Sequence, residues 1–363
     1  GPRVPLLGRE RHRRDDGQRT INTRPALLRP YTAHRSSRKA RSGRGLAGER
    51  RGRKREEERG AVGVGKAAGM PAAGIEWNQG WPRIEALIGR MISTLEAGTP
   101  LHFTPDDYLS IYRLVYDMCV QHRPCEYSGA LYDRYQKTIE GYALSCVLPT
   151  LSDKHGEILL GEFVRKWSIH RELVRWLSRF FEYLDRYYLV KKKLPALTVT
   201  GQLIFLEAVY EKVKHQVGVA ALSMIHQERE GNLIDGALLK NVLDIYVSMG
   251  AGSMKFYEQD FEMPMLSNTA LYYSQKAAKW ILADSFTDYM HKANECVKQE
   301  EDRALKYFQS RSKQKLLESV YHELFVVHAR LLEEKRLTES LSSHIIEVEI
   351  NQSLVQRYER LNL

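Results

Sequence analysis

The chain has 363 residues, 43% of them hydrophobic, which is enough for a sizeable core, and it carries a net charge of +10. Its purely apolar runs fall well short of the roughly 20 residues that span a bilayer, so we expect no membrane contact and a location in the cytoplasm and nucleus. The four cysteines form no Cys-x-x-Cys pair, which argues against a disulfide framework and a zinc ribbon.

Positive charge is concentrated at the start of the chain. Residues 1–69 hold 20 Lys and Arg against 7 Asp and Glu, and they contain no Phe, Trp or Met. Such a segment cannot bury enough apolar surface to offset the entropy of ordering, so we expect residues 1–74 to form a disordered Arg/Gly-rich basic tail. The remainder of the chain is slightly acidic.

The basic tail leaves a second function open, and other hypotheses concern the origin of the sequence. Its basic run at residues 50–55 could neutralise phosphates, which would make the chain a basic-tailed nucleic-acid-binding helical protein. Basic runs are usually just solvated, so we do not expect a nucleic-acid partner. Because the first methionine, Met70, lies where the composition changes, a second hypothesis is that residues 1–69 are translated leader sequence from an alternative gene model. A separate alternative is that the whole chain is a non-functional gene-model fragment.

No catalytic, cofactor-binding or metal-binding residues are expected. The stretch at residues 60–67 resembles a phosphate-binding loop, but Ala67 stands where a Ser or Thr must bind magnesium. His322 and His328 are six residues apart, so they lie on different sides of a helix and cannot share one metal. The paired carboxylates Glu300 and Glu301 lie in a strongly charged segment, where we expect them to be solvated.

From residue 75 onward, apolar residues recur at three- and four-residue intervals, so we expect an all-α fold. Caps and breakers predict a first group of five helices, at 81–97, 105–121, 128–149, 153–167 and 167–188. A basic run and a proline at 191–195 precede a second group. Its expected helices lie at 201–216, 217–229, 235–249, 256–264, 268–282, 289–309 and 312–334. Two such groups indicate an elongated stack of helical repeats.

The segment 167–188 has two distinct sides at helical spacing. Its apolar stripe predicts a buried face and consists of Leu173, Trp176, Leu177, Phe180, Phe181 and Leu184. With one residue of the second helix, the residues that we expect in the core are Val115, Leu173, Trp176, Phe180 and Leu184. A second row, formed by Arg179, Tyr183 and Arg186, would show a neighbour an edge of aromatic and guanidinium groups. Such an edge suits a protein partner.

Several blocks of sequence resemble the cullin family, scaffold subunits of ubiquitin ligases, and look most like the plant branch that works with F-box proteins. The segment LYDRYQKTIEGY at 131–142 and the segment VRWLSRFFEYLDRYYL at 174–189 carry the resemblance. Four further segments carry it too, at 237–250, 256–262, 272–281 and 315–329. The resemblance runs in order from about residue 77 to about residue 334.

This resemblance implies a first five-helix cullin-like repeat at 75–197, a second helical repeat at 198–335 and a divergent C-terminal tail at 336–363. A cullin holds a substrate adaptor at one end and a RING-finger protein at the other, and we expect this chain to be truncated before the RING-binding part. It would then be a non-catalytic scaffold fragment that binds the F-box-linked adaptor, without the RING-finger subunit. Such a fragment would be inactive or inhibitory in ubiquitin-dependent degradation.

The resemblance also implies the adaptor-binding residues, because the family grips its adaptor with the second and fifth helices of the first repeat. Tyrosine and arginine, with a large apolar body and a polar end, are common hot-spot residues of interfaces. The matching positions on the second helix are Tyr108, Leu109, Ile111, Tyr112 and Tyr116. Those on the fifth helix are Leu177, Phe181, Tyr183 and Arg186.

Overall fold

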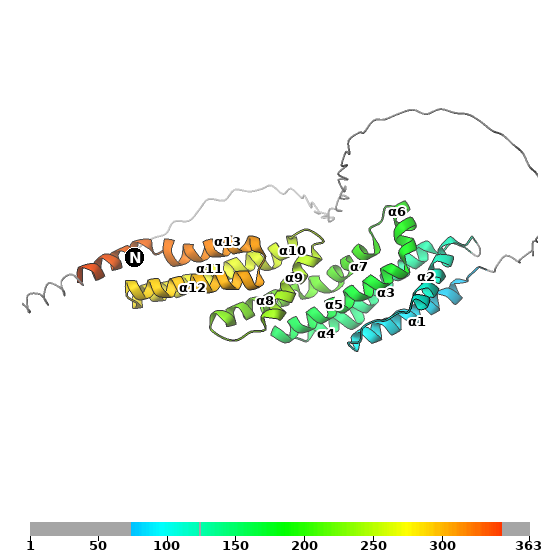
Figure 1. Ribbon diagram of the computed structural model, residues 1–363, viewed down its shortest axis with the longest axis horizontal. Helices are drawn as coiled ribbons and strands as arrows, with labels where there is room; N and C mark the ends of the chain where they lie inside the picture. Colours follow the sequence, from blue (N-terminus) through cyan, green and yellow to red (C-terminus); the bar gives the residue numbers. More distant parts are fainter. Residues whose placement is uncertain (1–73, 123–124, 343–363) are drawn as a thin grey trace, which may run out of the picture. The chain divides into compact units, whose positions relative to one another are not determined.

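The computed structural model describes residues 74–122 and 125–342, and every regular element in these ranges is helical (Figure 1). The predicted all-α class is therefore confirmed. All the described residues belong to one compact unit. Apart from residue 74, the predicted basic tail lies outside the described residues, and so do residues 343–363 of the predicted C-terminal tail.

The first group of helices is drawn in blue to green in Figure 1. Its elements are α1 (Trp77–Glu96), α2 (Pro105–Val120), α3 (Ser128–Tyr142), the π-helical turn η1 (Ala143–Val147), α4 (Leu148–Ser152), α5 (Gly156–Phe180), the π-helical turn η2 (Leu184–Tyr188) and α6 (Leu189–Lys192). The expected boundary near Trp167 is wrong, because α5 is one helix. Its buried stripe continues through that residue, and the helix is interrupted only at Phe181, whose backbone angles leave the helical region.

The second group follows in green to orange. Its elements are α7 (Leu197–Phe205), η3 (Leu206–Tyr210), α8 (Glu211–Arg229), α9 (Gly236–Met249), α10 (Lys255–Tyr257), η4 (Glu258–Glu262), α11 (Met263–Ala283), α12 (Phe286–Tyr307), α13 (Ser310–Tyr321) and η5 (His322–Val326). Residues 329–342 are also helical. The expected breaks at Val217 and after Pro264 are wrong. Val217 is buried within α8, and Pro264 lies in the first turn of α11, where a missing N–H costs little.

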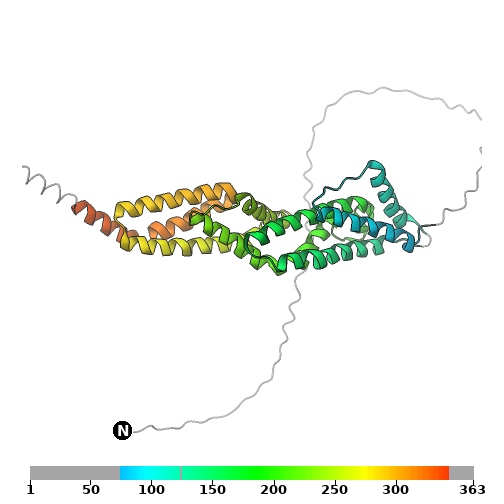
Figure 2. The same cartoon turned by 90° about the horizontal axis from the view of Figure 1, so that it is seen from below.

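Helix α5 links the two groups, because it packs on α7, α8 and α9 (Figures 1 and 2). The Trp167 ring of α5 meets the Phe205 ring of α7 edge-on, with centroids 4.9 Å apart. At Gly201 the approach is so close that an added Cβ would lie 2.6 Å from a methyl group of Val174. A glycine at this position therefore allows α7 to lie directly against α5.

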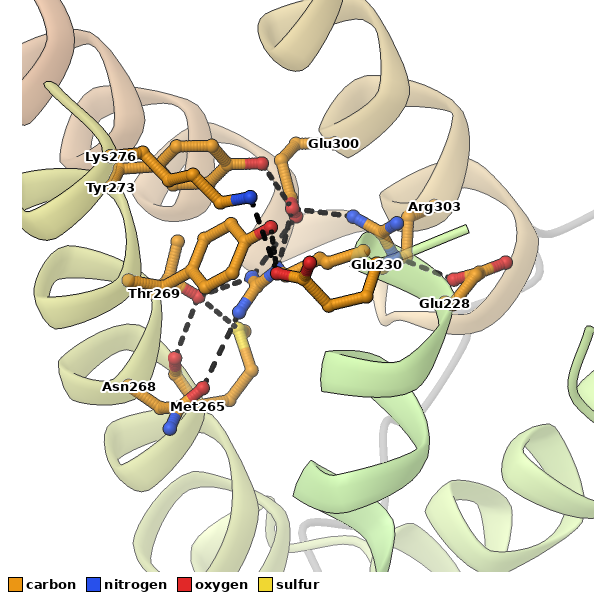
Figure 3. Close-up of polar contacts among 11 residues, drawn as sticks. Glu228, Glu230, Met265, Asn268, Thr269, Tyr273, Lys276, Glu300 and Arg303 are labelled. Atoms are coloured by element: carbon orange, nitrogen blue, oxygen red, sulfur yellow. Dashed lines mark hydrogen bonds and ion pairs between the residues drawn. The ribbon is translucent and has the colours of Figure 1, made fainter. Parts of the chain in front are cut away.

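A cluster of buried charges joins α8, α11 and α12 (Figure 3). The Glu300 carboxylate accepts hydrogen bonds from Arg229 Nε at 2.7 Å and from the Tyr273 hydroxyl at 2.8 Å, and it also pairs with Arg303. Arg303 in turn donates to Glu228 at 2.6 Å.

The expectation that Glu300 is solvated is thus wrong, since its side chain is 0% exposed. Burial alone would raise the pKa of Glu300, but the charges of Arg229 and Arg303 outweigh it and lower that pKa. Its neighbour Glu301 remains part-exposed and pairs with Lys313.

Candidate protein-binding site

A row of three tyrosines lies along one face of α2. The rings of Tyr108 and Tyr112 are stacked with centroids 6.2 Å apart, and those of Tyr112 and Tyr116 with centroids 6.4 Å apart. The start of α2 is fixed by a reciprocal capping box, in which the Thr104 side chain accepts from the Asp107 N–H and the Asp107 carboxylate accepts from Thr104. Because the three residues are four apart, a regular helix places their rings side by side.

Two further tyrosines, in the helical residues that follow α5, extend this row. The Tyr183 ring stands at 90° to the ring of Tyr116, with centroids 5.2 Å apart, and the Tyr187 ring lies 4.8 Å beyond Tyr183. At the other end, the Tyr108 ring packs 5.7 Å from the buried Phe180 ring. We call the five residues Tyr108, Tyr112, Tyr116, Tyr183 and Tyr187 the tyrosine rail.

The rail is partly open to solvent. Leu109 beside it is 57% exposed and Tyr116 is 40% exposed, whereas Tyr108, Tyr112 and Tyr183 are half-buried. Part of each ring is therefore held by the core and part is available to another molecule. Pre-set rings of this kind lose little conformational entropy when they bind.

Charged side chains lie beside the tyrosine rail. Arg186 is exposed and pairs with Glu182 one turn before it, and the Arg179 guanidinium lies over the Trp176 ring, 5.2 Å from its centroid. Burial raises the pKa of Tyr108 and that of Tyr183 above the usual value, so both phenols are protonated at neutral pH. The surface thus offers neutral hydroxyls and aromatic edges, flanked by guanidinium groups.

Two of the predicted contact residues lie elsewhere, in the core. Leu177 and Phe181 are both 0% exposed, and the Phe181 ring packs 5.9 Å from the Tyr135 ring of α3. They cannot touch a partner directly, so this part of the prediction is wrong. The family resemblance placed them in the contact, whereas their helical spacing put them on the apolar stripe, which packs into the core.

Ile111 lies outside the rail as well. It lines a different hollow, between α1, α2 and the loop at residues 100–103, together with Met91 and Leu101. Of the expected core residues, four are buried: Val115, Leu173, Phe180 and Leu184. Trp176 is instead half-buried, because its ring lies between Phe103 and the arginines of α5. For the remaining predicted contact residues, adaptor binding stays a prediction.

Tyr187 was missed by the sequence reasoning, although it is 59% exposed. The signal was present, since Tyr183 and Tyr187 have the same spacing of four as the tyrosines of α2. Within residues 74–122 and 125–342, no group of three or more His, Cys, Asp or Glu could hold a metal ion. None of the helices described there is both long and apolar enough to cross a membrane.

The family model of the cullin alpha solenoid domain matches residues 94–362. It continues past residue 336, where we expected the resemblance to end. Cullin-1 of Oryza sativa subsp. japonica is 48% identical over 261 residues, which cover 72% of this chain and 35% of that protein. Putative cullin-like protein 1 of Arabidopsis thaliana is 42% identical over 254 residues, covering 70% of this chain and 35% of that protein.

A shorter relative is matched over nearly its whole length. Cullin-like protein 3 of Arabidopsis thaliana is 37% identical over 247 residues, which cover 68% of this chain and 95% of that protein. The chain therefore spans about a third of the length of the two longer relatives, at 35% of each.

Proposed function

The chain belongs to the cullin family, and from this premise we propose that it is a non-catalytic scaffold of a ubiquitin ligase complex that binds a substrate adaptor through the tyrosine rail. A scaffold of this kind accelerates ubiquitin transfer by holding other proteins near each other, so it needs no catalytic residue of its own. The adaptor we propose is the F-box-linked one, as in the plant branch that the sequence resembles. We propose the cytoplasm and nucleus as its location.

The single observation that carries this proposal is the continuity of the rail across two segments far apart in the chain. Tyr116 of α2 and Tyr183 before η2 meet edge-on although 67 positions separate them, as their numbers show. Only the folded first group of helices brings them together. A partner that covers this contact recognises the folded helices and not a linear motif.

The chemistry of the rail fits a stable protein contact. Tyrosine combines a large apolar ring with a hydroxyl that can bond across an interface, and arginine at the rim can bind a carboxylate with two parallel bonds. Among the residues that the structure describes, Arg186 pairs only with Glu182, in an exposed pair that contributes little and can be exchanged for a partner's carboxylate. Hot spots are typically such aromatic residues near the centre of a contact.

The test is the affinity of a purified plant F-box-linked adaptor for the chain, measured by isothermal titration calorimetry. The double variant Tyr112→Ala and Tyr183→Ala is expected to bind at least about thirtyfold more weakly, because truncating two hot-spot rings costs more than about 2 kcal/mol. The matched control is Tyr321→Ala, which removes an exposed tyrosine of α13. Unchanged affinity of a folded double variant would refute the assignment of the rail.

A further inference from the structure

A second hollow, separate from the rail, opens between α5, the start of α7 and the end of α9. One wall carries three exposed arginines of α5, spaced four residues apart: Arg171, Arg175 and Arg179. The opposite wall carries polar side chains that can donate or accept hydrogen bonds, namely Thr198, Gln202 and Ser248. We call this hollow the arginine cleft.

The arginines of the cleft are available to a ligand. Among the described residues Arg171 has no ion pair, and Arg175 pairs only with the part-exposed Glu172 on its own helix. Pairs of this kind are worth little and can be exchanged. Arg179 leans on the Trp176 ring, which fixes its position without occupying its donors.

The carboxylates at the far end of the cleft are already engaged. Glu182 pairs with Arg186, and Asp185 accepts the Leu197 N–H at 2.8 Å. The cleft is therefore basic along α5 and becomes acidic only past Arg179. An anionic ligand would extend from Arg171 toward Arg179 and stop there.

The spacing of the arginines distinguishes between anionic ligands. Residues four apart on a helix are separated by about 6 Å along its axis, so the row of three extends over about 12 Å. Alternate side chains of an extended peptide are about 7 Å apart and point to the same side. A row of this length matches three alternate acidic side chains, whereas a single phosphate is best held by arginines that converge on one point.

A buried histidine belongs to the inner lining of the cleft. His170 donates from Nε2 to the carbonyl oxygen of Gly201 at 2.9 Å, which leaves Nδ1 as an acceptor with no partner among the described residues. Burial lowers the pKa of His170 to about 4, so the ring is neutral at physiological pH. Because the side chain is 0% exposed, the ring does not reach the peptide and adds no charge to the cleft.

We propose that the arginine cleft binds an extended acidic peptide segment, with alternate carboxylates on Arg171, Arg175 and Arg179 and the backbone against Thr198, Gln202 and Ser248. The cleft borders the rail, because Arg179 and Glu182 also line the hollow that contains Tyr108. An acidic extension of a protein bound on the rail could therefore enter the cleft. Peptide binding itself does not depend on the proposed function.

The experiment uses the full chain and a fluorescein-labelled octapeptide of alternating glutamate and serine, followed by fluorescence anisotropy at physiological ionic strength. The variant Arg171→Glu with Arg175→Glu is expected to bind at least about tenfold more weakly, because two attractive contacts become repulsive. The control Lys298→Glu with Lys306→Glu makes the same change of net charge on exposed positions of α12. It is expected to bind within about twofold of the original chain, because neither lysine lines the cleft and salt screens charges that are not in contact with the peptide.

Several results would overturn the proposal. The original chain would show no measurable binding, or the arginine variant would bind as tightly as the original chain. An equal loss of affinity in the lysine control would also overturn it, because net charge or the basic residues 1–69 would then attract the peptide. If inorganic pyrophosphate displaces the labelled peptide at a lower concentration than the unlabelled peptide does, the cleft is a phosphate site instead. If the reversal variant does not fold, Arg171→Gln with Arg175→Gln replaces it, with the same expected direction and about a threefold loss.

Discussion

Replacing Glu300 by glutamine tests the buried charge cluster of Figure 3. The change keeps the shape of the side chain but removes the negative charge that faces Arg229 and Arg303, whose side chains are only 2% and 5% exposed. Removing one partner of a buried pair leaves an uncompensated charge and typically costs about 3–5 kcal/mol. Glutamine can still accept a hydrogen bond, and Glu228 still compensates Arg303. We therefore expect the free energy of unfolding to fall by about 3 kcal/mol, at the lower end of this range.

The assay is thermal unfolding followed by circular dichroism. For a folded region of this size about 3 kcal/mol corresponds to a decrease in Tm of roughly 6–12 °C. The control is Glu301→Gln at the adjacent, part-exposed carboxylate, where we expect a change of at most about 1 kcal/mol. Equal melting of the Glu300 variant and the original chain would refute the inference that this cluster stabilises the packing of α8, α11 and α12.

The same cluster predicts a pH dependence. The pKa of Glu300 in the folded chain is lowered below its ordinary value of 4.5, with the arginines outweighing burial. Its contribution to the free energy of unfolding is therefore present above pH 4.5 and is lost as the pH falls toward the lowered pKa. The difference in stability between the original chain and the Glu300 variant should narrow in that acidic window and stay constant from pH 6 to 8.

The remaining predictions concern packing and thiol reactivity. Leu177→Ala should lower the free energy of unfolding by about 2–5 kcal/mol in urea titrations, because it leaves a cavity in the core; a loss below about 1 kcal/mol would contradict its placement there. Gly201→Ala should lower the Tm by several degrees through its clash with Val174, and an unchanged Tm would mean that α7 can shift away. Burial raises the pKa of Cys119 to about 12, so iodoacetamide at neutral pH should modify the exposed Cys146 first and reach Cys119 only in urea, as peptide mass spectrometry can show.

Helix positions were predictable where the sequence contains a local signal. Thr104 and Pro105 marked the start of α2 correctly, because a cap and a proline act within a single turn. The sequence did not predict that α5 continues through Trp167 and α8 through Val217, for the opposite reason. No strong breaker stands at Trp167 or Val217, and the expected boundaries rested on grouping apolar residues into helices of ordinary length.

The candidate site was predictable only in part. Spacing alone placed Tyr108, Tyr112 and Tyr116 on one face of α2, whereas the contact of Tyr116 with Tyr183 depends on the packing of separate helices. Leu177 lies in the core, as its place on the apolar stripe indicated, and only the family resemblance had assigned it to the contact surface.

The burial of Glu300 was hidden from the sequence in the same way. One of its partners, Arg229, lies 71 positions earlier in the chain, and a carboxylate beside Glu301 looks solvated until that arginine is placed. Long-range charge pairing of this kind follows only from the packed helices, so periodicity and local composition could not have predicted it.

Site-specific photocross-linking is the most direct way to learn whether the adaptor binds the tyrosine rail. A benzophenone amino acid placed at Leu109, exposed beside the rail, should cross-link to the F-box-linked adaptor, and the same probe at the exposed Leu305 of α12 should not. Cross-linking from Leu305 with none from Leu109 would contradict the claim, because the adaptor would then bind the second group of helices.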